Sequence, residues 1–187
     1  MTTVFLSGSR KLGRINDAIR QRLDNMIEKH MSIIVGDANG ADKAMQGYLA
    51  EREYKNVLVY FVGADCRNNI GSWVTSNVSV DPKLSGRDFY AQKDKQMAML
   101  ADLGLVLWDG KSAGSVHNVL ELLKHGKKAV VYYGPDKHFY NVASLEDAKS
   151  LLRNGDPRNL KSIKNKFGIE KSLKELELGK QITLGLF

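Results

Sequence analysis

The chain has 187 residues, of which 43% are hydrophobic and 26% are charged, a balance that is typical of a globular domain and excludes wholesale disorder. No apolar run approaches the ~18 residues that a membrane-spanning helix needs, and the first residues lack the basic segment of a signal peptide. A single cysteine, Cys66, excludes an internal disulfide framework. We therefore expect a protein of the reducing cytoplasm with no membrane partner.

The formal charge of +7 suggests a polyanionic partner, but the excess is not spread evenly. Residues 1–148 hold 19 Lys+Arg and 17 Asp+Glu, whereas residues 149–187 hold 9 and 4. Most of the positive charge therefore belongs to the C-terminal fifth of the chain. This region either binds nucleic acid through backbone electrostatics or forms a solvated helical surface or a dimer contact.

Five short apolar runs predict buried strands, because each one stops at a polar or glycine-rich loop. The runs are residues 4–6, 32–35, 57–62, 103–108 and 128–133. Helical periodicity fills the intervals near 15–27, 41–49, 88–101 and 116–123, and a stretch from about 63 to 86 is irregular. The alternation predicts an α/β fold, a Rossmann-like open parallel sheet of at least five strands with helices on both faces.

The pattern changes after Pro135. Ser144, with Asp147 three residues later, is typical of a helix start, and so is the pair Asp156-Pro157. We therefore expect two or three short basic helices between residues 145 and 178. The predicted organisation is a ligand-binding domain over residues 1–140, with a basic helical appendage packed on it over residues 141–187.

Three predicted loops are glycine-rich, and each precedes a helix. In an open parallel sheet, the loops after the carboxyl ends of the strands share one edge, and ligands bind there. The candidate ligand-binding residues are Gly8, Ser9, Arg10, Gly36, Asp37, Asn39, Gly40, Ala41, Asp42, Asp109, Gly110, Lys111, Ser112, Gly114 and Ser115. Helix starts present free N–H groups, and Arg10 and Lys111 add positive charge, so together the loops predict a phosphate-bearing ligand.

Other interpretations of these residues stay open. Glycines in such turns also serve tight geometry alone. Asp37 and Asp42 would repel phosphate, so each either contacts a ribose or base hydroxyl or caps a helix. Trp73 and Tyr90 either stack on a base or pack locally. Neither standard nucleotide-binding glycine fingerprint is present.

A catalytic role would fall to Asp109, His117 and Glu121. Carboxylates can stabilise a ribosyl cation, and His117 is either a general acid or base or a solvated helix residue. The remaining histidines lack metal-ligand spacing, so we expect no metal and no required cofactor beyond a nucleotide-like ligand.

The glycine-rich loops resemble those of the SLOG superfamily of Rossmann-like proteins, most closely its YspA-like branch. The matching stretches are 5–10, 35–42 and 108–117, and the resemblance spans about residues 3–133. It implies a site for nucleotides or nucleotide-derived ligands, such as ADP-ribose-like or NAD-derived molecules. The superfamily includes the LOG phosphoribohydrolases, sensors of signalling nucleotides in prokaryotic conflict systems, and the DprA group, which binds single-stranded DNA.

Two positions depart from that family pattern. Asn118 stands where the phosphoribohydrolases carry a catalytic glutamate, and an amide cannot exchange a proton as a carboxylate does. Glu121, one turn further, would need a shifted geometry to replace it. Asp37 and Asn39 stand where many relatives have a glycine and a basic residue, which favours recognition of hydroxyls or bases over bare phosphate.

The expected function is therefore nucleotide-ligand binding by a sensor or regulator, in a homodimer or a higher oligomer. The first alternative is a nucleotide N-glycoside hydrolase, a phosphoribohydrolase or a ribosyl transferase. The second is a nucleic-acid-binding protein that acts through its basic C-terminal region.

Overall fold

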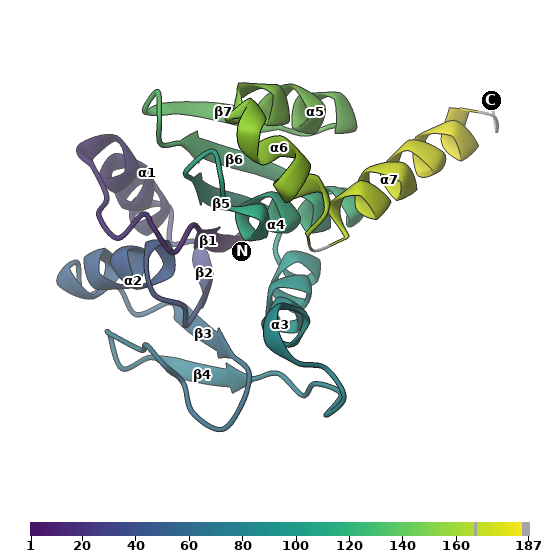
Figure 1. The fold of residues 1–187 in the computed structure, drawn as a ribbon. Helices are drawn as coiled ribbons and strands as arrows, with labels where there is room; N and C mark the ends of the chain where they lie inside the picture. The colour runs from purple at the N-terminus through teal and green to yellow at the C-terminus, as the bar shows by residue number, and fades with distance from the viewer. Residues whose placement is uncertain (167, 185–187) are drawn as a thin grey trace.

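A computed structural model describes residues 1–166 and 168–184, with side chains up to residue 179. The fold is a seven-stranded sheet with helices on both faces (Figure 1). The strands are β1 (Thr3–Gly8), β2 (Ser32–Gly36), β3 (Val57–Phe61), β4 (Val74–Asn77), β5 (Leu103–Trp108), β6 (Lys128–Tyr133) and β7 (His138–Val142). Their order across the sheet is β4-β3-β2-β1-β5-β6-β7, and only β7 runs antiparallel to its neighbour. The Rossmann-like fold class is thus confirmed.

Two strands lie outside the five predicted apolar runs. β4 falls inside the stretch expected to be irregular, and β7 follows Pro135. Both occupy sheet edges, where a strand has fewer buried positions and needs no continuous apolar run. The irregular stretch around β4 accordingly contains one short, mostly exposed strand.

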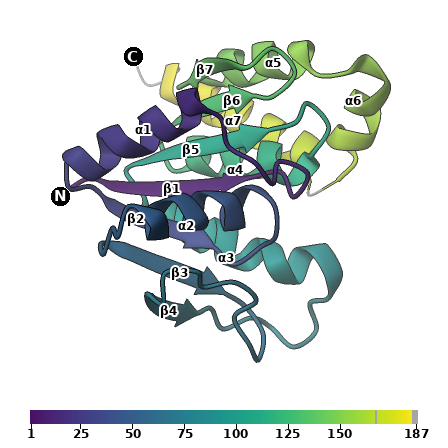
Figure 2. The same ribbon diagram turned by 90° about the vertical axis from the view of Figure 1, so that its left-hand side faces the viewer.

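The helices divide unequally between the two faces (Figure 2). α1 (Asp17–Glu28) and α2 (Ala41–Glu51) pack against the face that carries Val4 and Leu6. The opposite face, which carries Phe5 and Val106, is covered by a larger group of helices. That group is α3 (Gly86–Leu100), α4 (Ala113–Lys124), α5 (Leu145–Asn154), α6 (Pro157–Lys164) and α7 (Ile169–Leu184).

The C-terminal helices begin where the sequence predicts. The Ser144 side chain accepts a hydrogen bond from the Asp147 N–H at 3.1 Å, and Asp156 caps α6 ahead of Pro157. Ile163 and Ile169 lie in the same core cluster as α4 and the sheet, so α6 and α7 pack on the main body. The domain boundary expected at residue 140 falls within β7. Among the described helices, none is long and apolar enough to cross a bilayer.

Candidate functional site

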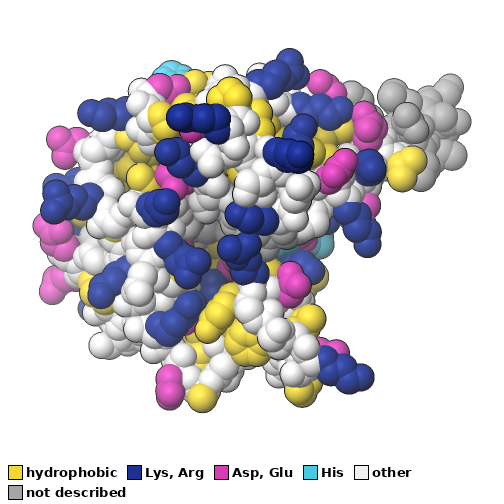
Figure 3. Space-filling model, viewed as in Figure 1, with side chains coloured by type: hydrophobic (Ala, Val, Ile, Leu, Met, Phe, Trp, Pro, Cys, Tyr) yellow, Lys and Arg dark blue, Asp and Glu magenta, His cyan; other side chains and the backbone are white. Residues whose placement is uncertain are grey.

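The three glycine-rich loops follow β1, β2 and β5, which are neighbours at the centre of the sheet. In Figure 2 the parallel strands run from left to right, so their carboxyl ends lie on the side that faces the viewer in Figure 1. We call this side the carboxyl edge and define it by the loops 9–16, 37–40 and 109–112. Figure 3 shows it directly, with Lys and Arg side chains gathered across its middle.

At Gly8, the end of β1 comes into close contact with β5 and with the start of α2. The next residue, Ser9, donates its N–H to the Leu107 carbonyl of β5 at 2.8 Å and accepts the Ala41 N–H of α2 at 3.1 Å. A Cβ at Gly8 would lie 2.5 Å from the Leu107 carbonyl oxygen and 2.7 Å from the Ala41 Cβ. Glycine is therefore required here for close packing of three backbone segments.

The start of α2 is covered by the loop 9–16. Gly40 has a left-handed φ of 86°, and a Cβ there would lie 2.3–2.4 Å from the backbone of Arg10. The first N–H of α2, from Ala41, is already used by Ser9. This helix start consequently has little room for the phosphate that its glycine-rich loop suggests.

The start of α1 is also occupied. Asn16 is its N-cap and accepts the Ile19 N–H at 3.1 Å, while Asp17 places a carboxylate in the first turn. Six residues separate Arg10 from Asp17, so the Ser9-Arg10 segment does not lead directly into this helix. Side-chain capping and a first-turn carboxylate both disfavour an anion at α1.

The start of α4 differs from the other two. Ser112 is its N-cap but makes no side-chain capping bond, and the first turn carries no acidic residue. Asp109 Oδ1 accepts the N–H groups of Lys111 and Ser112 at 3.1 and 2.7 Å, which shapes the loop. The first N–H groups of α4, beginning at Ala113, therefore have no side-chain cap, and the exposed Lys111 stands beside them. Of the three helix starts, this one suits an anion best.

Asp37 is paired with Arg67, a residue that no sequence motif predicts to lie in the site. Its side chain is fully buried, and Arg67 binds it with Nη2 at 2.5 Å and Nε at 2.7 Å. Burial alone would raise the pKa of Asp37, but the hydrogen bonds and charge of Arg67, together with Lys93, hold that pKa below its usual value. The Arg67 guanidinium also lies 4.6 Å from the centre of the Tyr90 ring. Asp37 thus serves to fix the segment after β3.

Asp42 belongs to the same network of buried charges, through Lys93 of α3. A Cβ at Gly36 would lie 2.6 Å from both Asp42 Oδ2 and Lys93 Nζ, so the bare glycine makes room for the two charges. Lys93 is 3% exposed and donates to Asp94 at 2.7 Å. Burial raises the pKa of Asp42 to about 7 despite Lys93. Asp42 therefore neither caps α2 nor faces an open ribose site.

The three candidate catalytic residues do not form one cluster. His117 and Glu121 are buried on α4, with Nδ1 and Oε1 3.9 Å apart, and Glu121 pairs with Lys124 at 3.0 Å. His117 is 3% exposed, so the alternative of a solvated helix histidine is wrong, and burial lowers its pKa. Asp109 instead organises its own loop. Asn118, at the position of the family glutamate, is also buried.

Among the remaining candidates, exposure separates two groups. Arg10, Asn39 and Lys111 are exposed on the carboxyl edge, whereas Ser9 and Ser115 are buried. Trp73 is buried and donates its indole N–H to the Tyr54 carbonyl at 2.8 Å, so it packs rather than stacks on a ligand. Among the residues with described side chains, no three His, Cys, Asp or Glu groups surround a potential metal position.

Comparison with known proteins shows a likeness in fold. No protein-family model matches the sequence, and no curated protein does so either. DNA processing protein A from Helicobacter pylori, solved for its single-stranded DNA binding mode, has a similar fold with a TM-score of 0.52 and 16% identity. The similarity covers 70% of this chain and 64% of that one, so the chain spans less than two thirds of the similar structure. At this identity the likeness concerns the fold.

Proposed function

We propose that the carboxyl edge binds single-stranded nucleic acid through its phosphates. The observation that carries the proposal is the loop 9–16, which presents Arg10, Lys11 and Arg14 as exposed cations and contains no carboxylate. Lys111 and the uncapped start of α4 lie on the same edge. Cations and helix starts are the groups that bind a phosphate backbone without reading its sequence.

The acids of this edge support the same interpretation. Asp37 and Asp42, which would repel phosphate if they were exposed, are buried with Arg67 and Lys93 as their partners. Neither carboxyl therefore adds negative charge to the exposed surface of this edge. The fold likeness to a protein whose single-stranded DNA binding has been described adds support.

Fluorescence anisotropy with a labelled single strand of about 20 nucleotides, titrated at several salt concentrations, tests the proposal. Replacing Arg10, Lys11 and Arg14 by Gln should weaken binding. It should also make the negative slope of log affinity against log salt shallower by about 2. The matched control neutralises three exposed lysines at the opposite edge of the sheet. Those control residues are Lys29, Lys55 and Lys128. Equal losses in the two triple variants would overturn the proposal.

The basic C-terminal region is the competing location for nucleic acid. α6 carries Arg158, Lys161 and Lys164, and all three are exposed. If neutralising these three residues abolished binding while the loop variant bound normally, nucleic acid would lie on α6 rather than on the loop 9–16.

A nucleotide-derived small molecule is the second candidate, favoured by the uncapped start of α4 beside Lys111. Calorimetric titration with ADP-ribose, NAD and AMP measures it directly. Native mass spectrometry of freshly purified protein would reveal a nucleotide that stays bound. Micromolar binding of one of these ligands, without affinity for single strands, would favour this candidate over nucleic acid.

Hydrolysis of an N-glycosidic bond is the remaining alternative. Its candidate groups are separated, since His117 and Glu121 are buried while Asp109 serves its loop. Chromatography after incubation with nucleoside monophosphates or NAD should therefore show no free base. Base release that disappears in Asp109→Asn would contradict this expectation and restore the enzymatic alternative.

A further inference from the structure

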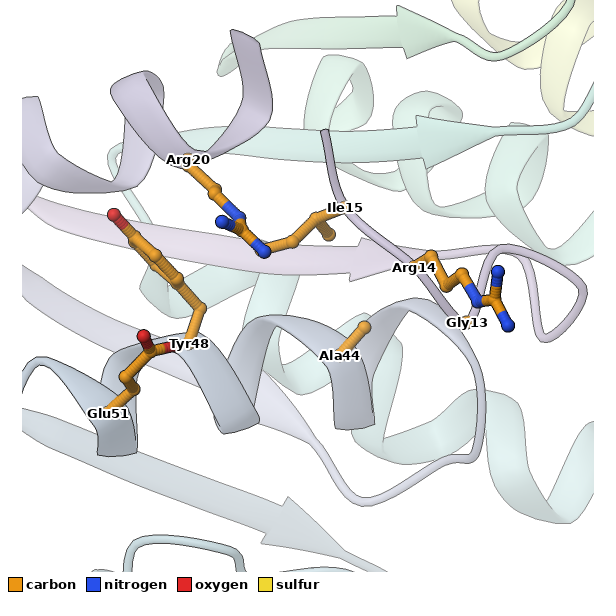
Figure 4. A pocket seen from close by; sticks show the side chains of 7 residues that line it. All are labelled: Gly13, Arg14, Ile15, Arg20, Ala44, Tyr48 and Glu51. Carbon is orange, nitrogen blue, oxygen red and sulfur yellow. The ribbon is translucent and has the colours of Figure 1, made fainter. Parts of the chain in front are cut away.

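A hollow of about 300 Å³ lies between α1 and α2, beside the end of the loop 9–16 (Figure 4). Its lining residues are Gly13, Arg14, Ile15, Arg20, Ala44, Tyr48 and Glu51. Three of them come from the loop that we propose as a phosphate contact, so the hollow continues the cationic part of the carboxyl edge. Its volume is at the lower end for small-molecule sites.

The Tyr48 ring, which lines the hollow, is fixed by the contacts of its hydroxyl group and by packing. The Tyr48 hydroxyl donates to the Asp24 carboxylate, with its oxygen 2.9 and 2.8 Å from the two carboxylate oxygens, and Arg52 pairs with the same carboxylate at 3.2 Å. Ile15 and Tyr48 are partly buried and pack against the core on this side of the sheet. The ring is consequently preorganised, and a ligand that stacks on it would not have to immobilise it.

Two arginines line the hollow in different ways. The Arg20 guanidinium lies 5.7 Å from the centre of the Tyr48 ring, and its carboxylate partner Asp17 is 4.0 Å away and fully exposed. Such a weak pair leaves Arg20 free to move aside or to cover a stacked ligand. In Figure 4 Arg14 extends away from the other lining residues, toward the side on which β1 ends. Arg14 therefore belongs to both the hollow and the carboxyl edge.

We propose that this hollow seats one nucleobase of a strand whose phosphates lie on the loop 9–16; this inference rests on the proposed function. The base stacks on the Tyr48 ring and is covered by the Arg20 guanidinium, two contacts that single-strand-binding proteins use for any base. Arg14 meets the adjoining phosphate. Glu51 is an exposed carboxylate on the rim, which can accept a hydrogen bond from an exocyclic amino group. The site therefore favours cytosine over thymine.

The test compares wild type, Tyr48→Phe and Tyr48→Leu by anisotropy on oligo(dC), oligo(dT) and an abasic strand of equal length. Both substitutions remove the hydroxyl that binds Asp24, but only the second removes the ring. Tyr48→Leu should weaken oligo(dC) binding on the order of tenfold relative to Tyr48→Phe. Binding of the abasic strand should be equal in the two variants.

Glu51 is tested separately, because it supplies base preference rather than stacking. Glu51→Gln should reduce the preference for oligo(dC) over oligo(dT). The control Glu28→Gln, which changes an exposed glutamate at the far end of α1, should leave that preference unchanged.

Normal binding by Tyr48→Leu would overturn the base site and leave the phosphate edge intact. Failure of the wild-type protein to bind any strand would overturn both proposals.

Discussion

The buried carboxyl of Asp42 should make the stability of the protein depend on pH in an unusual direction. Its pKa is about 7 in the folded chain, against an ordinary value of 3.8. Between these two pH values the folded chain holds a proton that the unfolded chain has released. The free energy of unfolding should therefore fall as pH rises from about 4 to 7 and level off above 7.

The size of the effect follows from the two pKa values. Moving from about pH 5 to about pH 8 should remove roughly 2–3 kcal/mol of stability through this carboxyl alone, at one pKa unit per 1.36 kcal/mol. Asp42→Asn cannot titrate, so its stability relative to wild type should increase by that amount over the same interval. Lys93, whose ordinary pKa lies far above this range, keeps its charge throughout.

Urea denaturation of the wild type and of Asp42→Asn at the two pH values measures this difference. Burial lowers the pKa of His117, so the free energy of unfolding falls as pH drops below the ordinary histidine pKa. This contribution has the opposite sign to that of Asp42. Both proteins contain His117, so its contribution cancels. Asp88→Asn, which removes an exposed carboxylate of α3, should follow the wild type. Parallel stability curves for the wild type and Asp42→Asn would refute the reasoning.

Three further substitutions test the packing of the site and of the core. Gly40→Ala should lower the free energy of unfolding by roughly 1–3 kcal/mol in urea denaturation, because Gly40 has a left-handed φ and a Cβ would strike the backbone of the loop 9–16. Arg67→Met should cost about 3 kcal/mol and move thermal unfolding downward, since it leaves the buried Asp37 carboxylate without its partner; an unchanged Tm would contradict this. Gly104→Ala should cost about 1–3 kcal/mol, because its Cβ would meet the Leu122 side chain in the core. Full stability of that variant would mean that the Leu122 side chain repacks around the added methyl group.

The parallel centre of the sheet could be predicted from the sequence because its strands are buried on both faces. Such strands are continuous apolar runs, as in β5. The two edge strands could not, because β4 is exposed at three of its four positions and β7 is only partly buried. Pairing with β3 and β6 makes these two segments strands, although their composition does not predict strands.

The meeting of the three glycine-rich loops could be predicted from the sequence, but the partners of their buried side chains could not. The glycine-rich loops do meet on one edge, as their places after parallel strands require. Asp37, however, takes its partner from 30 residues further along the chain, and the partner of Asp42 comes from α3. No sequence pattern marks Arg67 or Lys93 as such partners. Which helix starts are open depends on backbone contacts, such as that of Ser9 with Ala41, which only the folded geometry reveals.

The central place of β1 has a consequence for synthesis. Of the seven described strands, β1 leaves the ribosome before the others, yet one of its two neighbours is β5, and Thr3 donates its N–H to Asp102 at a separation of 99 residues. A nascent chain that ends before β5 can pair β1 with β2 only, and the other side of β1 stays open. Such late, long-range closure slows folding and exposes an unpaired strand to aggregation. We therefore expect chains stalled before residue 103 to require chaperone protection until β5 emerges.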